Sequence, residues 1–557
     1  MKKLFALILA AALLISMIGC GPVADVELEE NKTQLIVGMS DGGIGTEWME
    51  RLIAAFEEKY KDYSFEEGKT GVQVVIGSKN RTTMLGETLI DIIGTSEIKD
   101  EVFFTEGAYY NQFVEKGLLY DITEAMNSPL TEFGEDKSVT QKMSKDTLDQ
   151  LTMDGKLYAV PYWRSGYGMV YNATLFNQNS WYYDANGNFT DAKGNLGTGP
   201  DGKPGTYDDG LPRTYDEFFT LLERIEKDNC TPFQMAGASG DYFSWLIGQM
   251  AADVMGYEDV RLNFDFNGTA TLVKEGTIDW DNMTYETEEV EITPENGYEL
   301  ARQPGLVHAL SFAQRLMQNT KYYDPNNCLS GSFKIAQSQL EFVRNPTIST
   351  KKNVAIMLDG VWWENEAIAS FRETYGSNAT KYDSTMEYKW MALPKATEEM
   401  VGSESLAVNV LYSYGFIKSN IAPEKVEVAT KFLQFAHTDA MLADFTETTG
   451  IFKPFEYPVN EEKLTSFSKS MKAYFDSSIA VDALSNCDLY RSAPADFWVA
   501  RWLRSKYADD QLPYEIISSV LVEKNGSEYR YDAEDLYNGI VKYRKDFRWG
   551  QYSSVIG

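Results

Sequence analysis

Short apolar runs alternate with stretches of helical spacing in the first 120 residues that follow the leader. The runs, which are typical of buried strands, cover residues 35–39, 72–76 and 102–104. After the first run, apolar side chains return every three or four residues, at Met49, Leu52, Ile53 and Phe56. This spacing predicts a helix, and a second helix is expected at 109–116. Strands that alternate with helices predict a βαβ layout and a mostly parallel sheet, which binds ligands at the carboxyl ends of its strands.

The rest of the chain continues this mixture without internal repeats, heptads or low-complexity tracts. Helical spacing is found at 214–227, 242–254, 306–318, 422–436 and 496–507. Strand-like runs are found at 354–358, 390–393 and 414–417. Residues 177–210 differ, because they are rich in Gly, Asp, Asn and Pro and have little periodicity. They predict a long loop or insertion.

The first residues are typical of an export signal. Two lysines precede an apolar run over residues 4–18, which is shorter than the roughly twenty residues that a bilayer-spanning helix needs. The run ends in Met-Ile-Gly-Cys20, which resembles the lipobox of bacterial lipoproteins, although Leu is more usual than this Met. We expect residues 1–19 to be removed, Cys20 to be lipidated and the acidic residues 20–33 to tether the protein outside the cell. The alternative is an ordinary signal with an incidental cysteine.

Composition narrows the range of functions. The 557 residues carry a formal charge of −32, and so acidic a chain repels phosphate backbones, which argues against nucleic-acid binding. The 34 Tyr, 29 Phe and 11 Trp supply more apolar area than a disordered chain carries. The only histidines, His308 and His437, leave few candidates for a His-rich metal site or a Ser-His-Asp triad.

The cysteines limit the disulfides. With Cys20 lipidated, Cys230, Cys328 and Cys487 remain. Three is an odd number, so at most one disulfide is expected, and the spacing leaves open which pair would form it.

A series of short motifs in a fixed order runs through the chain. The motifs are Val102-Phe-Phe104 with Gly117-Leu-Leu-Tyr-Asp-Ile-Thr123, Gly155-Lys-Leu-Tyr-Ala-Val-Pro-Tyr-Trp163 followed by Met169-Val-Tyr-Asn172, Asp241-Tyr-Phe-Ser-Trp245 with Ala251-Ala-Asp253, Ala355-Ile-Met-Leu-Asp-Gly-Val-Trp362 with Leu393-Pro-Lys395, and Val428-Ala-Thr-Lys-Phe-Leu-Gln-Phe435 with Thr449-Gly450. In these motifs the chain resembles the extracellular solute-binding proteins of bacterial ABC importers, specifically the maltose-binding type. Each motif is weak alone, but the order of all of them is specific.

The resemblance implies a fold and a function. The fold is an α/β, two-lobe periplasmic-binding-protein-like fold of type II, with a ligand cleft between lobes joined by hinge crossovers. The crossovers are expected near Ser165, between 395 and 407, and near Gly450. One lobe would comprise 34–164 with 406–450, and the other 165–405 with 451–557. The function is that of a lipid-anchored, monomeric receptor on the extracellular face of the cell membrane, which binds a carbohydrate, expected to be an oligosaccharide, and delivers it to an ABC permease.

Aromatic side chains are the first group of candidate ligand residues, because flat rings stack on the apolar face of a pyranose. By resemblance the candidates are Trp163, Tyr242, Trp245, Trp362 and Trp498. Trp362 has an adjacent alternative, Trp363. We expect Trp362 to face the cleft and Trp363 to pack in the core, since neighbours on an extended segment point in opposite directions.

Polar candidates come from the other lobe and from the first crossover. They are Thr46, Glu47, Thr105, Glu106 and Arg164. Thr46 and Glu47 follow a glycine-rich turn whose free N–H groups would bind oxygens. Their alternative role is to cap the helix that follows. Arg164 would bind a carboxylate or sugar hydroxyls in a bidentate way, or else form a salt bridge between the lobes.

The insertion contains a candidate calcium site. Residues 184–188 offer side-chain oxygens at alternate positions, as the start of an EF-hand loop does, and resemble a calcium loop of some oligosaccharide-binding family members. Positions six and twelve depart from that pattern, being Phe189 and Asn195. The proposed ligands are Asp184, Asn186, Asn188, Asp201, Asp208 and Asp209. The alternative is a pair of Asx-rich turns without an ion, and no other cofactor is expected.

Two other classes of protein remain as alternatives. A secreted glycoside hydrolase also uses aromatic and carboxyl groups on sugars, and it would need two carboxyl groups about 5–9.5 Å apart. Glu47 and Glu106 are the pair that the sequence offers. A receptor of the same fold for a non-sugar solute, such as a peptide or polyamine, is the third reading. The ordered motifs favour the sugar receptor.

Overall fold

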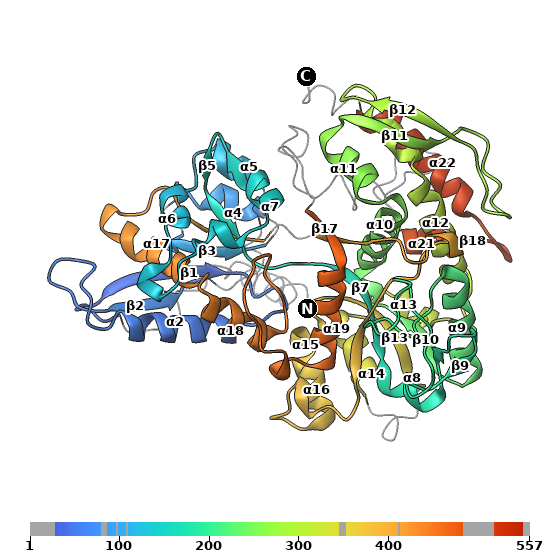
Figure 1. The fold of residues 1–557 in the computed structure, drawn as a ribbon, viewed down its shortest axis with the longest axis horizontal. Coiled ribbons are helices and arrows are strands. Elements are labelled where there is room, and N and C mark those ends of the chain that lie inside the picture. The colour runs from blue at the N-terminus through green and yellow to red at the C-terminus, as the bar shows by residue number, and fades with distance from the viewer. Residues whose placement is uncertain are drawn as a thin grey trace, which may run out of the picture.

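The computed structural model describes residues 28–78, 86–95, 98–106, 110–344, 352–409, 413–482 and 517–549. Within these residues the chain forms two lobes, each built around its own sheet and covered by helices (Figure 1). The two-lobe α/β architecture expected from the sequence is therefore confirmed. The leader, Cys20 and the candidate Trp498 lie outside the described residues, as does the predicted helix at 496–507.

The first lobe contains a five-stranded sheet of order β2-β1-β3-β16-β6. The strands are β1 (Thr33–Met39), β2 (Val72–Ile76), β3 (Val102–Thr105), β6 (Ala159–Pro161) and β16 (Tyr414–Ile417). β1 is parallel to β2 and β3, whereas β16 is antiparallel to its neighbours β3 and β6. The helices are α2 (Glu47–Lys59), α4 (Gly86–Ile92), α5 (Tyr110–Glu115), α6 (Thr123–Asn127), α7 (Lys145–Leu151), α17 (Val426–Phe435) and α18 (Asp439–Thr449), with a small ribbon of β4 (Thr152–Met153) and β5 (Lys156–Leu157).

Helix α2 forms where the sequence has apolar residues at helical spacing. Its apolar stripe buries Met49, Leu52 and Phe56 against the sheet and the neighbouring helices. The ring of Phe56 lies 5.0 Å from that of Phe432 in α17, in an edge-to-face contact. An acidic first turn and a basic last residue, Lys59, complement the helix dipole.

The second lobe contains a four-stranded sheet of order β10-β13-β7-β14. The strands are β7 (Tyr167–Asn172), β10 (Thr231–Gln234), β13 (Val354–Gly360) and β14 (Tyr388–Met391). β13 is buried along its whole length, as expected for a strand covered on both faces. The helices are α8 (Ala173–Asn179), α9 (Tyr215–Lys227), α10 (Asp241–Met255), α11 (Tyr257–Asp265), α12 (Pro304–Met317), α13 (Pro325–Cys328), α14 (Ile335–Val343), α15 (Trp363–Glu366), α16 (Ile368–Tyr375), α19 (Ser466–Ser477), α21 (Ile517–Leu521) and α22 (Ala533–Tyr543).

The second lobe also contains small two-stranded sheets. The longest is the hairpin of β11 (Gly268–Val273) and β12 (Thr287–Ile292), which the sequence pattern did not predict. The others pair β8 (Tyr182–Tyr183) with β9 (Phe189–Thr190) and β18 (Lys524–Asn525) with β19 (Glu528–Tyr529). The β8–β9 pair lies inside the predicted insertion, so part of 177–210 is regular structure rather than loop.

The chain passes between the two sheets at three places. It leaves the first sheet after β6 for β7, returns between β14 and β16, and leaves again between α18 and α19. Near the second passage, β15 (Ser405–Asn409) pairs in parallel with β17 (Ser478–Asp482). Gln249 of α10 holds β15, because its amide donates to Leu406 O at 2.6 Å and accepts from Val408 N at 2.9 Å. The expected lobe boundaries, which placed 406–409 in the first lobe, stay a prediction.

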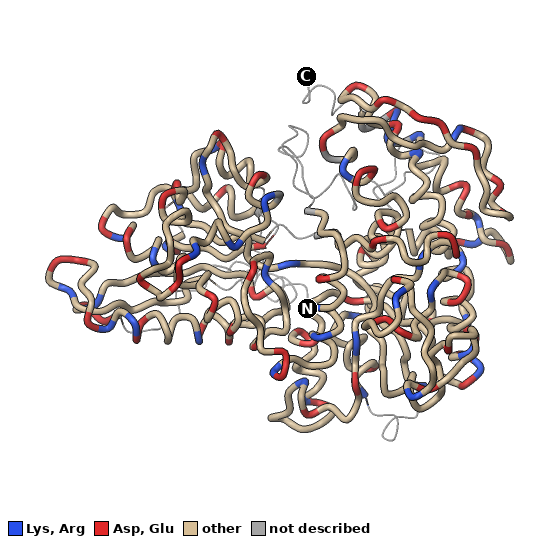
Figure 2. Tube along the Cα trace, in the orientation of Figure 1, with Lys and Arg blue, Asp and Glu red and all other residues tan. Residues whose placement is uncertain are grey.

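Charged residues are interspersed over both lobes, with acidic ones in excess (Figure 2). Cys230 and Cys328 are buried free thiols, whereas Cys487 lies outside the described residues. In the part of the chain that the structure describes, no helix is both long and apolar enough to cross a bilayer.

Candidate ligand-binding site

Five aromatic rings meet where the first crossover enters the second lobe. We call them the aromatic cluster: Trp163, Tyr167, Tyr242, Trp245 and Trp362. Trp362 is the centre, with ring centroids 5.0 Å from Tyr167, 5.9 Å from Trp163 and 6.1 Å from Tyr242. Tyr167 also stacks on Trp245 at 5.6 Å with an interplanar angle of 14°. Four residues proposed from three separate motifs are thus brought together, and Tyr167 completes the cluster.

Backbone geometry places these rings. Trp163 follows β6, Tyr167 begins β7, and Tyr242 and Trp245 occupy the first turns of α10. Trp362 stands two residues after β13, and its indole folds back over Gly360, where a Cβ atom would overlap the ring. The glycine of the Gly-x-Trp motif is therefore needed for the position of the tryptophan.

Trp362 and Trp363 have different surroundings. Trp363 is fully buried and packs against Phe342, Tyr388 and Phe467, with centroids 5.0–5.6 Å away. The prediction that Trp363 belongs to the core is confirmed by this burial. The segment is helical rather than extended, because Trp362 has αR dihedral angles and caps α15. Trp362 is 4% exposed, and its role in ligand binding stays a prediction.

Polar groups adjoin the cluster on the second lobe. Gln339 of α14 donates its amide to Asp359 Oδ2 at 3.2 Å and to Glu366 Oε2 at 2.8 Å. Burial, and then the neighbouring charge of Glu366, raises the pKa of Asp359 to about 8. A carboxyl group that keeps its proton near neutral pH is a hydrogen-bond donor as well as an acceptor. Sequence reasoning missed these three residues, although an acid at the end of the apolar run 355–358 is an unusual feature.

The first lobe presents Thr105 and Glu106 at the end of β3. Both are fully buried, and Thr105 Oγ1 donates to the carbonyl of Glu106 at 3.3 Å. The Glu106 carboxylate lies against Gly42, whose φ of +41° and lack of a Cβ atom permit the approach. The glycine-rich turn and the end of β3 are thus adjacent, as expected for the carboxyl ends of neighbouring parallel strands.

Thr46 and Glu47 lie apart from the aromatic cluster. Thr46 precedes α2, but its hydroxyl donates to Glu50 at 2.9 Å instead of capping the helix. Both residues line a pocket of about 430 Å³, to which Arg51, Asn365 and other residues of both lobes also contribute but no ring of the aromatic cluster does. Glu106 does not line this pocket, so the two carboxyl groups of the hydrolase alternative are not found together in it. The ligand roles of Thr46 and Glu47 stay predictions.

Arg164 leaves the first crossover toward α19. Its backbone N–H donates to Phe452 O at 2.9 Å, and its guanidinium lies 5.8 Å from the ring centroid of Phe475. Among the described residues no salt bridge of Arg164 is found, so the alternative of an interlobe ion pair has no support there.

Lys453, on the third crossover, is the most unusual charged group. Its side chain is 3% exposed, and its ammonium has no hydrogen-bond partner among the described residues. It lies between 4.4 and 5.8 Å from the ring centroids of Trp48, Phe104, Tyr162 and Phe445. Burial lowers the pKa of Lys453 to about 7. The rings compensate only part of the lost hydration of the cation.

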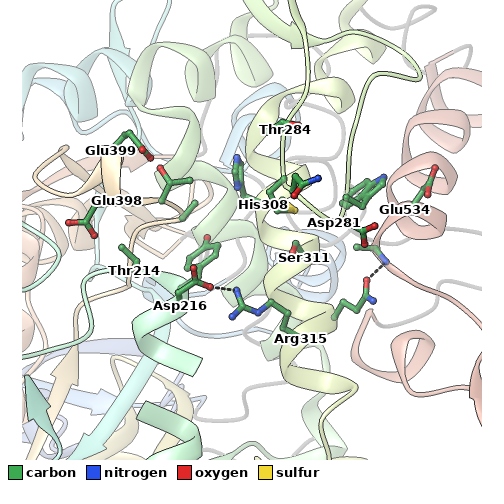
Figure 3. Close-up of a pocket in the computed structure, with 18 of the residues that line it drawn as sticks. Thr214, Asp216, Asp281, Thr284, His308, Ser311, Arg315, Glu398, Glu399 and Glu534 are labelled. Carbon is green, nitrogen blue, oxygen red and sulfur yellow. Dashed lines mark hydrogen bonds and ion pairs between the residues drawn. The ribbon is translucent and has the colours of Figure 1, made fainter. Parts of the chain in front are cut away.

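A second cavity, of about 1130 Å³, lies within the second lobe (Figure 3). It is bordered by α9, α12, α22 and the loop of the β11–β12 hairpin. Its lining is acidic, with Asp281, Glu399 and Glu534 around an Arg315–Asp216 ion pair of 2.8 Å. None of the candidate ligand residues lines it.

The candidate calcium ligands fall into two loops. Asp184 Oδ1 accepts from the backbone of Asn186 and Asn188 at 2.8 and 2.9 Å, which is an Asx-turn geometry. Asp208 is buried and accepts from Asp201 N at 3.0 Å and from a threonine hydroxyl at 2.6 Å. The remaining candidate, Asp209, accepts from Gly205 N at 2.7 Å. In the described ranges no group of three His, Cys, Asp or Glu side chains has the arrangement of a metal site. Calcium binding stays a prediction.

Comparisons with known proteins bear on the family and on the fold. The family model of the bacterial extracellular solute-binding proteins matches residues 52–471. Among solved structures, RafE in complex with raffinose has a TM-score of 0.52 at 12% identity, covering 94% of this chain and 98% of that one. Maltose-bound MalE3 of T. maritima has a TM-score of 0.52 at 13% identity, covering 92% and 99%.

A chitin oligosaccharide binding protein has a TM-score of 0.51 at 14% identity, covering 81% of this chain and 89% of that one. At such low identity these likenesses show the shared fold. No curated protein sequence matches the chain significantly. Because the family model spans most of the chain, this protein belongs to the bacterial extracellular solute-binding protein family.

Proposed function

We propose that this protein is the receptor component of an ABC importer and binds a carbohydrate between its lobes. The ligand is an oligosaccharide that lies on the aromatic cluster, and lobe closure encloses it before delivery to the membrane permease. A lipid on Cys20 anchors the receptor to the outer face of the cell membrane. The receptor acts as a monomer, does no chemistry on the sugar and needs no cofactor for binding.

The aromatic cluster is the observation that carries the proposal. Rings offer apolar faces to the C–H side of a pyranose, and nearby polar groups bind its hydroxyls. Both kinds of group are present: Tyr167, Tyr242 and Trp245 are partly exposed, Glu366 adjoins Trp362, and Asp359 shares the amide of Gln339 with Glu366. The printed names of three neighbouring structures mention raffinose, maltose and chitin oligosaccharide, all of them sugars, which supports a carbohydrate as the ligand class.

A thermal-shift screen of the mature protein against neutral, amino and acidic oligosaccharides tests the ligand class. Raffinose, maltotriose and a chitin tetramer belong in the panel. We expect at least one sugar to raise the unfolding midpoint, because a ligand that binds only the folded state stabilises it. No shift with any sugar, together with a shift by a peptide or polyamine, would contradict the proposal.

Two variants locate the site. Tyr242→Ala should weaken the binding of the stabilising sugar by roughly one to two decades, the scale of a buried aromatic hot spot. Tyr63→Ala removes another exposed tyrosine, on the first lobe, and should leave the affinity unchanged. Calorimetric titration measures both. Equal affinities for the two variants would show that the sugar lies elsewhere.

Labelled oligosaccharide separates the receptor from a hydrolase. The receptor should return the label as intact ligand after prolonged incubation, whereas a hydrolase would release shorter products. Anchoring is tested separately, since Cys20→Ser should move the protein from the membrane fraction to the medium. Retention of that variant in the membrane would contradict the lipid anchor.

A further inference from the structure

A turn of the first lobe reaches the tryptophan at the centre of the aromatic cluster. We call residues 41–45 the glycine turn; it connects β1 to α2. Its backbone is closed by hydrogen bonds from Ile44 N and Gly45 N to Asp41 O, at 2.6 and 3.2 Å. Gly43 has a φ of +84°, a conformation that residues with a side chain rarely adopt.

The contact itself is made by Gly43. A Cβ atom placed on Gly43 would lie 3.1 Å from Trp362 Cδ1 and 3.5 Å from both Cβ and Cδ of Glu366. By contrast, a Cβ atom on Gly45, whose φ is +74°, would have no heavy atom within 4 Å. Gly43 and Gly45 therefore share a left-handed conformation that a residue with a side chain would adopt only with strain, but only Gly43 faces the other lobe.

The surface that Gly43 meets is held in place by the second lobe and by the first crossover. Trp362 is fixed by the rings of Trp163 and Tyr167, and Glu366 by the amide of Gln339 at 2.8 Å. The glycine turn contributes the first-lobe side of the contact. A Cβ atom at position 43 would require the indole to shift by a few tenths of an ångström, and a longer side chain would also press against the carboxyl group of Glu366.

A second interlobe contact lies nearby, at the third crossover. Asn365 and Lys381 of the second lobe both donate to Thr449 O at the carboxyl end of α18, the lysine at 3.4 Å. Gly450 follows in a left-handed conformation with φ of +75°, against Ser468 and Lys381. These bonds belong to a connecting segment and hold the lobes at one point. The glycine turn, in contrast, meets Trp362 and Glu366 without a covalent connection nearby in the sequence.

We propose that the glycine turn docks on Trp362 and Glu366 when the lobes close, so that Gly43 is a positioning residue for ligand binding. Gly43 has no side chain to bind a ligand, and it acts by letting the first lobe approach Trp362 and Glu366 of the second. The inference rests on the proposed function for the identity of the ligand. The contact can be tested without any ligand.

Cysteine cross-linking tests the contact. The 3.5 Å between the Cβ positions of residues 43 and 366 is within the range of a disulfide. The mature protein with Gly43→Cys and Glu366→Cys should form this disulfide under mild oxidation, as peptide mass spectrometry would show. Gly45→Cys with Glu366→Cys is the matched control, and its yield should be much lower. Equal yields in the two pairs, or none in the first, would overturn the proposal.

Affinity tests the positioning role. Asn tolerates a positive φ, so Gly43→Asn and Gly45→Asn carry similar backbone costs but differ in steric fit. With raffinose, maltotriose or a chitin tetramer, whichever the parent binds, Gly43→Asn should bind about tenfold more weakly, as overpacked contacts do. Gly45→Asn should retain the parental affinity, and both should unfold at similar midpoints. Parental affinity in Gly43→Asn would refute the positioning role.

The two arms separate the possible failures. If none of these sugars binds the parent but the 43–366 disulfide forms, the contact stands and the carbohydrate proposal fails. If a sugar binds and accelerates the 43–366 disulfide, both stand. If a sugar binds and the 43–366 pair behaves like the 45–366 pair, the carbohydrate proposal stands and the glycine turn does not dock.

Discussion

At the scale of single residues, two adjacent tryptophans have opposite surroundings. Trp363 lies inside the second-lobe core, whereas Trp362 faces the aromatic cluster and the glycine turn. Trp363→Ala should lower the free energy of unfolding by roughly 3–5 kcal/mol, because it leaves a cavity in a packed core. Trp362→Ala should weaken sugar binding by roughly 1–3 kcal/mol.

Denaturant unfolding measures the first quantity and calorimetric titration the second. Trp363→Ala, studied where it is still folded, should bind sugar as the parent does. If Trp362→Ala binds as tightly as the parent and is the less stable of the two, the roles of the pair are reversed.

Lys453 makes a prediction about pH. Its pKa is lowered from the ordinary value near 10.4 to about 7, so between these values the unfolded chain binds more protons than the folded one. The free energy of unfolding is therefore highest above about pH 10, where the amine is neutral in both states. It decreases as the pH falls from 10 and has lost this contribution once the pH has passed through 7. Lys453→Met should remove this dependence and raise the free energy of unfolding at pH 7 by up to roughly 4 kcal/mol.

Urea unfolding at pH 6, 7, 8 and 9 compares the variant with the parent. The control is Lys469→Met, which removes an exposed lysine of α19 and should leave the pH profile of the parent unchanged. If the free energy of unfolding depends on pH in the same way for Lys453→Met and the parent, Lys453 is hydrated or paired in solution. Its burial among the four aromatic rings would then be wrong.

At the scale of elements, the spacing of apolar residues predicted helices and strands that depend on local sequence. The helical spacing at 214–227 predicted α9 within one residue of its start, and the structure adds an N-cap there, since Thr214 Oγ1 accepts from Glu217 N at 3.3 Å. The β11–β12 hairpin was missed because its strands lack a long apolar run: β12 carries three Glu in six residues and buries only Ile292, although Leu272 and Val273 of β11 are buried. The sequence predicted only part of the aromatic cluster, because Tyr167 joins the other rings through a tertiary contact between β7 and α10.

Some contacts between side chains of different motifs can be seen only in the folded structure. Lys395 and Asp253 lie in two separate motifs, and both are buried with Nζ and Oδ2 2.9 Å apart. Nothing in the spacing predicts such a pair. The same holds for Gln339, which contacts Asp359 and Glu366 from a helix with no motif of its own.

The insertion gives a prediction about calcium. If an ion links the loop of Asp184 to that of Asp201 and Asp208, chelation should lower the unfolding midpoint and added calcium should restore it. Asp184→Ala should abolish that response. Asp191→Ala, on the same insertion, is the control and should keep it. Scanning calorimetry in chelator and in calcium measures the effect, and identical melting in both, in protein free of tightly held metal, would rule out the site.

At the scale of the whole molecule, the two sheets are joined by three passages of the chain, so the lobes can move as bodies about them. The aromatic cluster lies beside the first passage, and the glycine turn approaches it from the other lobe. A ligand that contacts both lobes binds the closed state better than the open one and shifts the population toward it.

Small-angle X-ray scattering of the mature protein, with and without a saturating sugar from the screen, tests this account most directly. The account predicts a smaller radius of gyration with the sugar, and a smaller decrease for Trp362→Ala at the same sugar concentration, because that variant is less fully occupied. An unchanged scattering profile of the parent at a sugar concentration that calorimetry shows to be saturating would contradict binding by lobe closure.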